Sequence, residues 1–477
     1  CLAGQKNGSH RVIQLYWRHI PESEGSAAMT DKGNNKKHAL IARHRTGSPS
    51  HGVAHHKRGI MRQFSRLRAA GIGALAAFFA VLGPGLLAGL SDDDPAGITT
   101  YSVLGTDFGY RFLWVIPFST ILLIQYHLMA VRIGAATNLG FVGVIRAHWG
   151  RGWGYFAALG LLFANFGTIC AEYAGISAAF SLVSIPAWIS APLACVLISL
   201  LVVYGSFHRV ERVLLIVSAT LALYIVDGIL AAPDWQQVWR NSVIPNMPDS
   251  RLGWIAVAAA LGTTLAPWGL AFIQSYAVDK KITVASLGWE KVDVIIGSVL
   301  TGIIGLAIAV ACAATLHRAG VHINDAGDAA AALEPLAGRF ATVLFGAGLL
   351  GASLLAAAIV PLATSYSIAE GIGAPASLDL DSRHFQIFYA VFVGLAVAAA
   401  SVVSIPGLPL IPLIYTSQVV NAVMLPLHVI ALTLLAGNPD IMGAARIGKT
   451  SLIASWISIT LILACIGALA SSWIASL

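Results

Sequence analysis

The sequence predicts an all-α polytopic membrane protein, and three observations lead to that prediction. Hydrophobic residues make up 57% of the 477 residues and charged residues only 11%, against about 25% in average soluble domains. The mean hydropathy is +0.77. Several apolar stretches reach about 20 residues, which is long enough to cross a bilayer as a helix. The apolar runs do not alternate with polar residues, which disfavours a β-barrel, and the composition excludes a disordered chain.

The basic charge of the chain is concentrated at its N-terminus. Residues 1–68 contain 13 of the 29 Lys and Arg residues and three acidic residues, a local net charge of +10; the remainder has 16 basic and 19 acidic residues, or −3. This distribution predicts a basic, His-rich, disordered cytoplasmic segment over residues 1–69 and a transmembrane domain over residues 70–477. Because the membrane part is slightly acidic, the overall basic charge does not predict a nucleic-acid partner.

The transmembrane domain contains about eleven apolar segments. They lie near 71–104, 112–134, 152–182, 190–206, 210–231, 252–277, 291–316, 340–372, 384–403, 408–436 and 451–475. With a cytoplasmic N-terminus, the inner loops contain eleven Lys and Arg residues and the outer loops five, which agrees with the positive-inside rule. The odd number of helices then places the C-terminus outside, and we expect an integral protein of the bacterial inner membrane.

The first apolar segment is interrupted at its centre by acidic residues and a proline. Asp92, Asp93 and Asp94 lie between apolar stretches and are followed by Pro95. Each charge costs roughly 3 kcal/mol at the centre of a bilayer, and proline disfavours helix at the residue before it. We expect two half-helices with free carbonyl groups and carboxylates at membrane depth, lining a buried or wet cavity. The alternative is a surface loop between two short helices.

The sixth apolar segment has a similar interruption, from Gly262 to Leu270, with Pro267 at its centre. The two interruptions lie five helices apart. This spacing is typical of a five-plus-five inverted repeat in which helices 1 and 6 are broken and the substrate binds where the two breaks meet. Taken alone, the sixth interruption is also compatible with a simple proline kink.

These motifs, in this order, resemble those of the Nramp family of divalent-metal transporters over about residues 70–475. The resemblance rests on Gly83-Pro84-Gly85 followed by Asp94-Pro95, on the sixth-segment break, and on the stretches 417–426 and 438–443. In that family the first-helix motif is Asp-Pro-Gly-Asn and the sixth-helix motif is Met-Pro-His. The family coordinates a transition metal through the Asp, the Asn, the Met sulfur and a backbone carbonyl three residues before the Met.

The resemblance implies a metal site that lacks two of the family's ligands. Asp94 matches the metal-binding Asp, and Thr263 occupies the position of the carbonyl donor. Gly97 stands where the family has Asn, and Ala266 stands where it has Met. Gln418 matches a glutamine that lies near the ion in the family.

The missing ligands favour Mg²⁺ as the substrate. A thioether selects transition metals, so Ala266 removes that selection, and Gly97 removes an amide oxygen. A carboxylate, a carbonyl and space for water remain, which suits an ion that keeps several of its waters. Asp92 and Asp93 are expected to bind the hydrated ion or to raise its local concentration. The pattern resembles the Nramp-related magnesium transporter branch, with Mn²⁺ as a second candidate ion.

Proton coupling is expected to be weak or absent. The stretch Thr168–Glu172 resembles the family's Thr-Asp-x-Ala-Glu, in which the acidic residues form a proton route, but Ile169 replaces the Asp. Trp268 stands at the position of the family's His. Neither side chain titrates, which leaves Glu172 as either a remaining proton carrier or a structural carboxylate.

Two other functions remain open at this point. One is a proton-coupled Mn²⁺/Fe²⁺ importer of ordinary Nramp type, and the other is an amino-acid or organic-solute symporter on the same fold. No nucleophile–base pair or metal triad appears in the sequence, so we do not expect an enzyme. No cofactor is expected beyond the divalent ion as substrate; the expected partners are that ion and the lipid bilayer, and a monomer is sufficient.

Overall fold

The computed structural model describes residues 92–204, 223–324, 326–330, 338, 341–374 and 386–474. Every regular element within these ranges is helical, which confirms the predicted all-α fold class. The predicted N-terminal segment and the apolar residues before Asp92 lie outside the described residues.

The long helices are Gly-rich and Ala-rich, as expected where helices pack closely in a membrane. They are α7 (Val115–Thr137), α9 (Arg151–Ser181), α10 (Ala187–Tyr204), α16 (Leu287–Ala314), α20 (Ala341–Ile372), α21 (Gln386–Val403), α22 (Leu410–Gly437) and α24 (Lys449–Ile474). The shorter elements are α6 (Pro95–Phe108), α8 (Phe141–Trp149), α12 (Leu223–Leu230), α13 (Trp235–Val243), α14 (Arg251–Thr264), α15 (Pro267–Asp279), η2 (Val284–Ser286), α17 (Leu316–Ala319), α18 (Ala326–Ala330), α23 (Pro439–Met442) and η6 (Gly443–Ala445).

Seven spans among the described residues are long and apolar enough to cross a membrane, and α14 and α15 together form one of them. α10 and α21 are apolar but slightly shorter. Nine of the eleven predicted segments correspond to described helices within a few residues. The first and fifth segments are described only in part, so the count of eleven stays a prediction.

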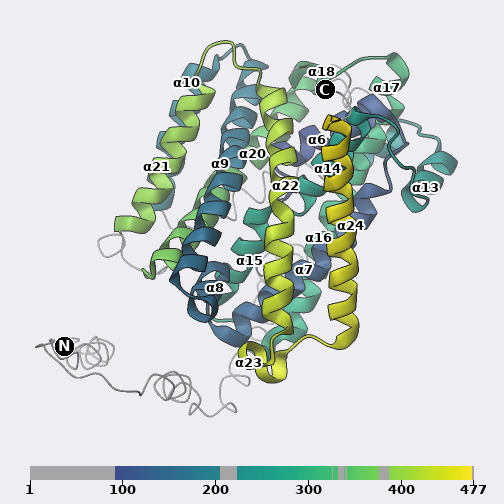
Figure 1. The fold of residues 1–477 in the computed structure, drawn as a ribbon. Coiled ribbons are helices and arrows are strands. Elements are labelled where there is room, and N and C mark those ends of the chain that lie inside the picture. Colours follow the sequence, from purple (N-terminus) through teal and green to yellow (C-terminus); the bar gives the residue numbers. More distant parts are fainter. Residues whose placement is uncertain are drawn as a thin grey trace, which may run out of the picture. The chain divides into compact units, whose positions relative to one another are not determined.

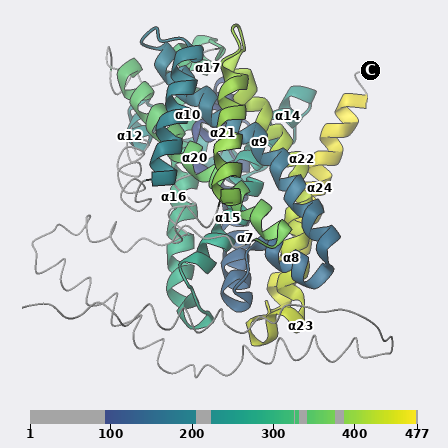
Figure 2. The same cartoon turned by 90° about the vertical axis from the view of Figure 1, so that its left-hand side faces the viewer.

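The helices pack in the pairs that an inverted repeat requires. α6 packs against α14, α7 against α16, α9 against α20, and α10 against α21. Each member of a pair lies at the same place in its own half of the chain, counted from the broken helix. Figures 1 and 2 both show α10 beside α21.

Two groups of helices flank the breaks. One group contains α6, α7, α14, α15 and α16, and the other contains α9, α10, α20 and α21. α22 packs against both α9 and α14, and α24 packs against α14 and α22. The break in the sixth segment therefore lies between helices from both groups.

The two halves of the sixth segment lie at different depths. In Figure 1, α6 and α14 lie in the upper half of the helical bundle, whereas α15 and α8 lie in the lower half. α13 and α17 lie at the upper end and α23 at the lower end (Figure 1). The loops that the charge distribution assigns to the cytoplasm include those near α8 and α23, and the assignment of that end to the cytoplasm stays a prediction.

Candidate functional site

The first break ends at the start of α6, where Asp94 is the N-cap residue. Its backbone is extended, with φ −73° and ψ 177°, because Pro95 disfavours helix at the residue before it. The Gly97 N–H donates to Asp94 Oδ1 at 2.7 Å, and the Ile98 N–H donates to the Asp94 carbonyl at 3.0 Å. The side chain thus caps a helix that begins in the middle of the apolar segment, as the sequence predicted.

The second break separates α14 from α15 at Leu265 and Ala266. Leu265 is the last residue bonded to α14, through its N–H to the Leu261 carbonyl at 3.0 Å. In a continuous helix the carbonyl of Thr263 would accept from the N–H of residue 267. That residue is proline and has no N–H, so the Thr263 carbonyl loses its helical partner. The role of this carbonyl as a metal donor stays a prediction.

Four carboxylates are buried around the first break. The exposed fractions are 2% for Asp92, 1% for Asp93, 4% for Asp94 and 0% for Glu172. None of the buried residues that the structure describes is lysine or arginine. A buried carboxylate is costly unless a positive charge or hydrogen-bond donors compensate it. The burial excludes a surface loop at Asp92–Asp94, and a bound cation would stabilise the charged form of these carboxyl groups.

Glu172 lies on α9 and faces Asp94 across the helix interface. The two carboxyl groups are close enough for their charges to interact. The Glu172 carboxyl group lies within hydrogen-bonding reach of the Asp94 carboxyl group, whereas neither Asp93 oxygen has a hydrogen-bond partner among the described residues. Buried polar groups are usually satisfied, so these oxygens are available to a cation or to its water shell.

Residues 169 and 268, where the Nramp motifs have titratable side chains, are buried and cannot exchange protons here. The Ile169 and Trp268 side chains have exposed fractions of 0%. The Trp268 indole Nε1 has no hydrogen-bond partner among the described residues. It is an N–H donor only, so it can orient a water or a carboxylate but cannot relay a proton.

Gly97 lies so close to the backbone of Asp92 that a larger side chain would not fit there. A Cβ at this position would lie 2.7 Å from the Asp92 carbonyl oxygen and 3.6 Å from Asp94 Oδ1. An asparagine here would therefore require the backbone to move. Gly97 instead contributes its N–H to the capping bond, while the buried Ala266 side chain offers no ligand atom.

Gln418 lies on α22, and both polar atoms of its side chain are hydrogen-bonded. Its Nε2 donates to Ser417 Oγ at 2.7 Å, and its Oε1 accepts from Asn421 Nδ2 at 3.0 Å. Asn421 Nδ2 also donates to Thr168 Oγ1 on α9 at 2.9 Å. The backbone of Gln418 lies directly against Gly262 of α14. Gln418 thus lies close to the break in the sixth segment. To bind an ion through Oε1, it would have to lose the hydrogen bond from Asn421.

A second network, which the motifs did not predict, joins α6 and α14, one half of each broken helix. Tyr101 Oη and Thr264 Oγ1 form a hydrogen bond of 2.7 Å between α6 and α14. Ser119 Oγ of α7 donates to the same Thr264 oxygen at 3.0 Å. Tyrosine, serine and threonine in apolar helices are too common to single out by sequence, so only the tertiary contact identifies this link.

No group of three or more His, Cys, Asp or Glu side chains within the described part of the chain is arranged to bind a metal directly. A divalent cation at the breaks would need further ligands from backbone oxygens or water.

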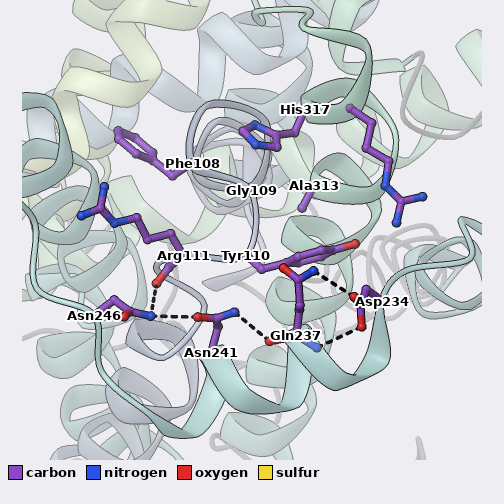
Figure 3. A pocket seen from close by; sticks show the side chains of 11 residues that line it. Phe108, Gly109, Tyr110, Arg111, Asp234, Gln237, Asn241, Asn246, Ala313 and His317 are labelled. Carbon is purple, nitrogen blue, oxygen red and sulfur yellow. Dashed lines mark hydrogen bonds between the residues drawn. The ribbon is translucent and has the colours of Figure 1, made fainter.

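A separate polar cavity of about 520 Å³ lies at the far end of α6, roughly 20 Å from Asp94 at 1.5 Å per helical residue. Figure 3 shows Tyr110, Gln237, Asn241 and His317 around it. Asn241 Nδ2 donates to the Gln237 carbonyl at 2.9 Å.

An ion pair lies beside this cavity. Arg111, which lines it, contacts Asp249 at 2.8 Å, and the hydrogen bond from the Arg111 guanidinium holds the pKa of Asp249 below its usual value. Because each cation near the cavity has an acidic neighbour, the cavity is not a strong anion site.

A family model described as natural resistance-associated macrophage protein-like, abbreviated Nramp, matches residues 85–472. The match spans both breaks and the α22 segment. This chain belongs to the Nramp family. The prediction from the motifs is thereby confirmed, although the match does not distinguish the magnesium branch from the rest of the family.

Individual relatives agree with this assignment. The divalent metal cation transporter MntH of Caldanaerobacter subterraneus subsp. tengcongensis is 27% identical over 379 residues, which cover 77% of this chain and 87% of that protein. A structure of the Eremococcus coleocola manganese transporter, in complex with an aromatic bis-isothiourea substituted compound, matches with a TM-score of 0.63 and 20% identity, over 83% of this chain and 87% of that one.

A third similarity extends beyond metal transporters. The structure of MhsT in complex with L-phenylalanine matches with a TM-score of 0.57 and 16% identity, over 80% of this chain and 98% of that one. At these identities the two structural matches show the fold alone. The family consists of transporters, so this Nramp chain is an integral membrane protein and not an enzyme, as predicted.

Proposed function

We propose that this Nramp protein transports divalent metal cations across the membrane, with Mg²⁺ favoured and with weak or no coupling to protons. The observation that supports the proposal is the burial of four carboxylates, Asp92, Asp93, Asp94 and Glu172, without a buried lysine or arginine among the described residues. A divalent cation compensates two of these charges at once. The relatives named as divalent metal cation transporters support the same substrate class.

The ligand set favours Mg²⁺ over transition metals. Asp94 and the Thr263 carbonyl supply hard oxygen atoms, while Ala266 lacks the thioether that prefers softer ions. Gly97 cannot be replaced by a larger ligand without moving the backbone. With few protein ligands, the ion keeps several waters, and Mg²⁺ sheds water more reluctantly than the transition metals do.

The driving force is the electrochemical gradient of the ion itself. Ile169 and Trp268 do not titrate, so the route that the Nramp resemblance assigns to protons has lost two of its members. A divalent ion that moves inward across the membrane gains about 4.6 kcal/mol per 100 mV, at about 2.3 kcal/mol per charge. This gain is sufficient for uptake without a coupled proton. A single chain contains both breaks, so a monomer is sufficient, and we propose the bacterial inner membrane as its location.

An organic-solute or amino-acid symporter is disfavoured by the charge of the site. In transporters with this architecture, the N-termini of half-helices bind the substrate carboxylate. Here four buried carboxylates surround the first break, and they would repel such an anion. The similarity to MhsT therefore concerns the fold.

The test uses the purified full chain in liposomes that contain a Mg²⁺-sensitive dye or, in parallel, a pH dye. Mg²⁺ and Mn²⁺ are added outside in separate runs, with protein-free liposomes as the control. We expect Mg²⁺ entry without internal acidification. Mn²⁺ entry with acidification and no Mg²⁺ entry would instead establish the proton-coupled transition-metal importer. Entry of neither ion would overturn the proposal.

A further inference from the structure

α13 is an amphipathic helix that is too short to cross the membrane. It has nine residues, whereas a membrane span needs about 20. Trp235, Trp239 and Val243 follow one another at intervals of four residues and therefore lie on one face of the helix. Gln237 and Asn241 lie on the opposite face and line the polar cavity at the end of α6 (Figure 3).

The apolar face of α13 is exposed. The exposed fraction is 55% for Trp235 and 74% for Trp239, and Val243 is exposed as well. The residue of α13 that is buried against the rest of the protein is Val238. Isolated helices shorter than about 12 residues are marginal in water, so α13 needs a second apolar surface to pack against.

The flanking segments place α13 at the edge of the membrane. α12, before it, is the described end of the fifth predicted apolar segment, and α14, after it, begins a membrane span. Residues 231–234 connect α12 to α13, and residues 244–250 connect α13 to α14. Connections this short keep α13 at the boundary where one span ends and the next begins. Figure 1 shows α13 at the periphery of the upper end of the bundle.

The exposed apolar surface of the spans continues onto α13. Ile229 and Leu230 are exposed at the end of α12, Ile244 and Met247 just after α13, and Leu252 at the start of α14. Lipid covers the outward-facing side chains of membrane spans, and the apolar face of α13 is continuous with them. Tryptophan is enriched at membrane–water interfaces, because its ring is apolar and its N–H is polar.

A second copy of the chain fits this face less well than lipid does. Three side chains of this size expose on the order of 400 Å². Each partner in a stable protein–protein interface buries about 800 Å². A bilayer has no such minimum area, since it already surrounds the neighbouring spans.

We infer that α13 lies in the membrane–water interface, with Trp235 and Trp239 inserted into the lipid. Interfacial helices bury their apolar face about 5–10 Å into the boundary between headgroups and acyl chains, which supplies the second apolar surface. Because Gln237 and Asn241 lie on the opposite face, contact with lipid holds them over the polar cavity. The inference goes beyond the proposed function and does not depend on which ion is transported.

The test is photo-cross-linking of the full chain in liposomes of phosphatidylethanolamine and phosphatidylglycerol. Trp239→benzoylphenylalanine places a photoreactive group on the apolar face, and mass spectrometry detects a covalent phospholipid adduct after irradiation. The matched control is Gln237→benzoylphenylalanine, at an exposed position on the opposite face of the same helix. We expect the lipid adduct at residue 239 to exceed that at residue 237 by at least about fivefold, because only the apolar face enters the lipid.

Two results of this experiment would overturn the inference. One is a lipid adduct at residue 239 that is absent or no more abundant than at residue 237. The other is an adduct with the mass of a second chain in place of lipid, which would show that α13 mediates a contact between two copies.

Hydrogen exchange in the same liposomes provides a second measurement without a photoreactive residue. Trp235→Ser combined with Trp239→Ser removes the lipid contact, so the backbone amides of α13 should exchange at least about tenfold faster. Trp188→Ser, which removes an exposed tryptophan from α10, should leave exchange in α13 unchanged. Equal exchange of α13 in the double variant and in this control would contradict the inference.

Discussion

The two broken helices are interrupted by the same backbone arrangement, but their N-cap side chains differ: one is a carboxylate and the other is apolar. Each break has a non-helical N-cap residue followed by proline, at Asp94–Pro95 and at Ala266–Pro267. At the first break the cap is a carboxylate that bonds to its own helix through Gly97. At the second break the cap has no polar side chain, and the helix before it contributes the unpaired carbonyl of Thr263.

The two breaks show that proline sets the backbone geometry, whereas the N-cap residue sets the charge. Proline creates a break at any cap residue, because it removes an N–H donor and disfavours helix before it. The type of ion then depends on the side chains at the two caps. In the proposed site, one anionic cap and one apolar cap offer oxygen ligands only, which favours Mg²⁺. A single substitution at either cap should change this preference.

The largest effect should come from the first break. Asp94→Asn keeps an N-capping side chain but removes the charge that binds the ion. We expect Mg²⁺ uptake in liposomes to fall by about a hundredfold, since removing one member of a buried charge pair costs about 3 kcal/mol. The exposed Asp440, changed to Asn, is the control and should retain uptake. Near wild-type uptake by Asp94→Asn would contradict the assignment of this residue.

The second break is tested by Pro267→Ala. The new N–H at residue 267 can pair with the Thr263 carbonyl and compete with the ion for it. Uptake should fall by about tenfold, the equivalent of about 1.4 kcal/mol for one hydrogen bond of this kind. Pro192→Ala, in α10 and exposed on the helix surface, is the matched control. Equal uptake by the two variants would show that the carbonyl does not bind the ion.

Ala266→Met should make the second break resemble the ordinary Nramp motif. A thioether at this cap prefers transition metals, so the ratio of Mn²⁺ to Mg²⁺ uptake should rise by about fivefold, or about 1 kcal/mol of selectivity. Ala390→Met, at an exposed position of α21, controls for the added side chain. An unchanged ratio would mean that the ion does not contact residue 266.

The smallest effect concerns the link between α6 and α14. Tyr101→Phe removes the hydroxyl that bonds to Thr264 at 2.7 Å. A loss of about 1 kcal/mol is expected for such a hydrogen bond, and the thermal midpoint of the detergent-solubilised protein should fall by a few degrees. Tyr155→Phe, on the exposed face of α9, should leave the midpoint unchanged. The same midpoint in both variants would mean that this bond contributes nothing to stability.

Much of the fold was predictable because its signals are local. The segments corresponding to α7, α9 and α16 follow from the length of apolar stretches alone. The breaks follow from Asp94–Pro95 and from Pro267, since the effect of proline on the helix does not depend on distant residues.

The details of the site were less predictable because they depend on contacts between distant helices. Gln418 appeared as an isolated match, yet its Oε1 atom is bonded to Asn421, which also bonds to Thr168 on another helix. Likewise, His127 appeared only as a polar residue in an apolar helix. The short distance between its ring and Gly269 depends on α15 packing against α7, and no local sequence pattern predicts that contact.

The sequence by itself determined the fold class, the positions of the two breaks and the side chains at the two caps. These follow from hydropathy, from proline chemistry and from residue identity at single positions. The tertiary structure alone decided that Asp94 faces Glu172, that Gly97 has no room for a side chain, and that Gly269 lies directly against the Asp92 carboxyl group. Such properties depend on distances between atoms that are far apart in the chain, and only the packing of the helices sets those distances.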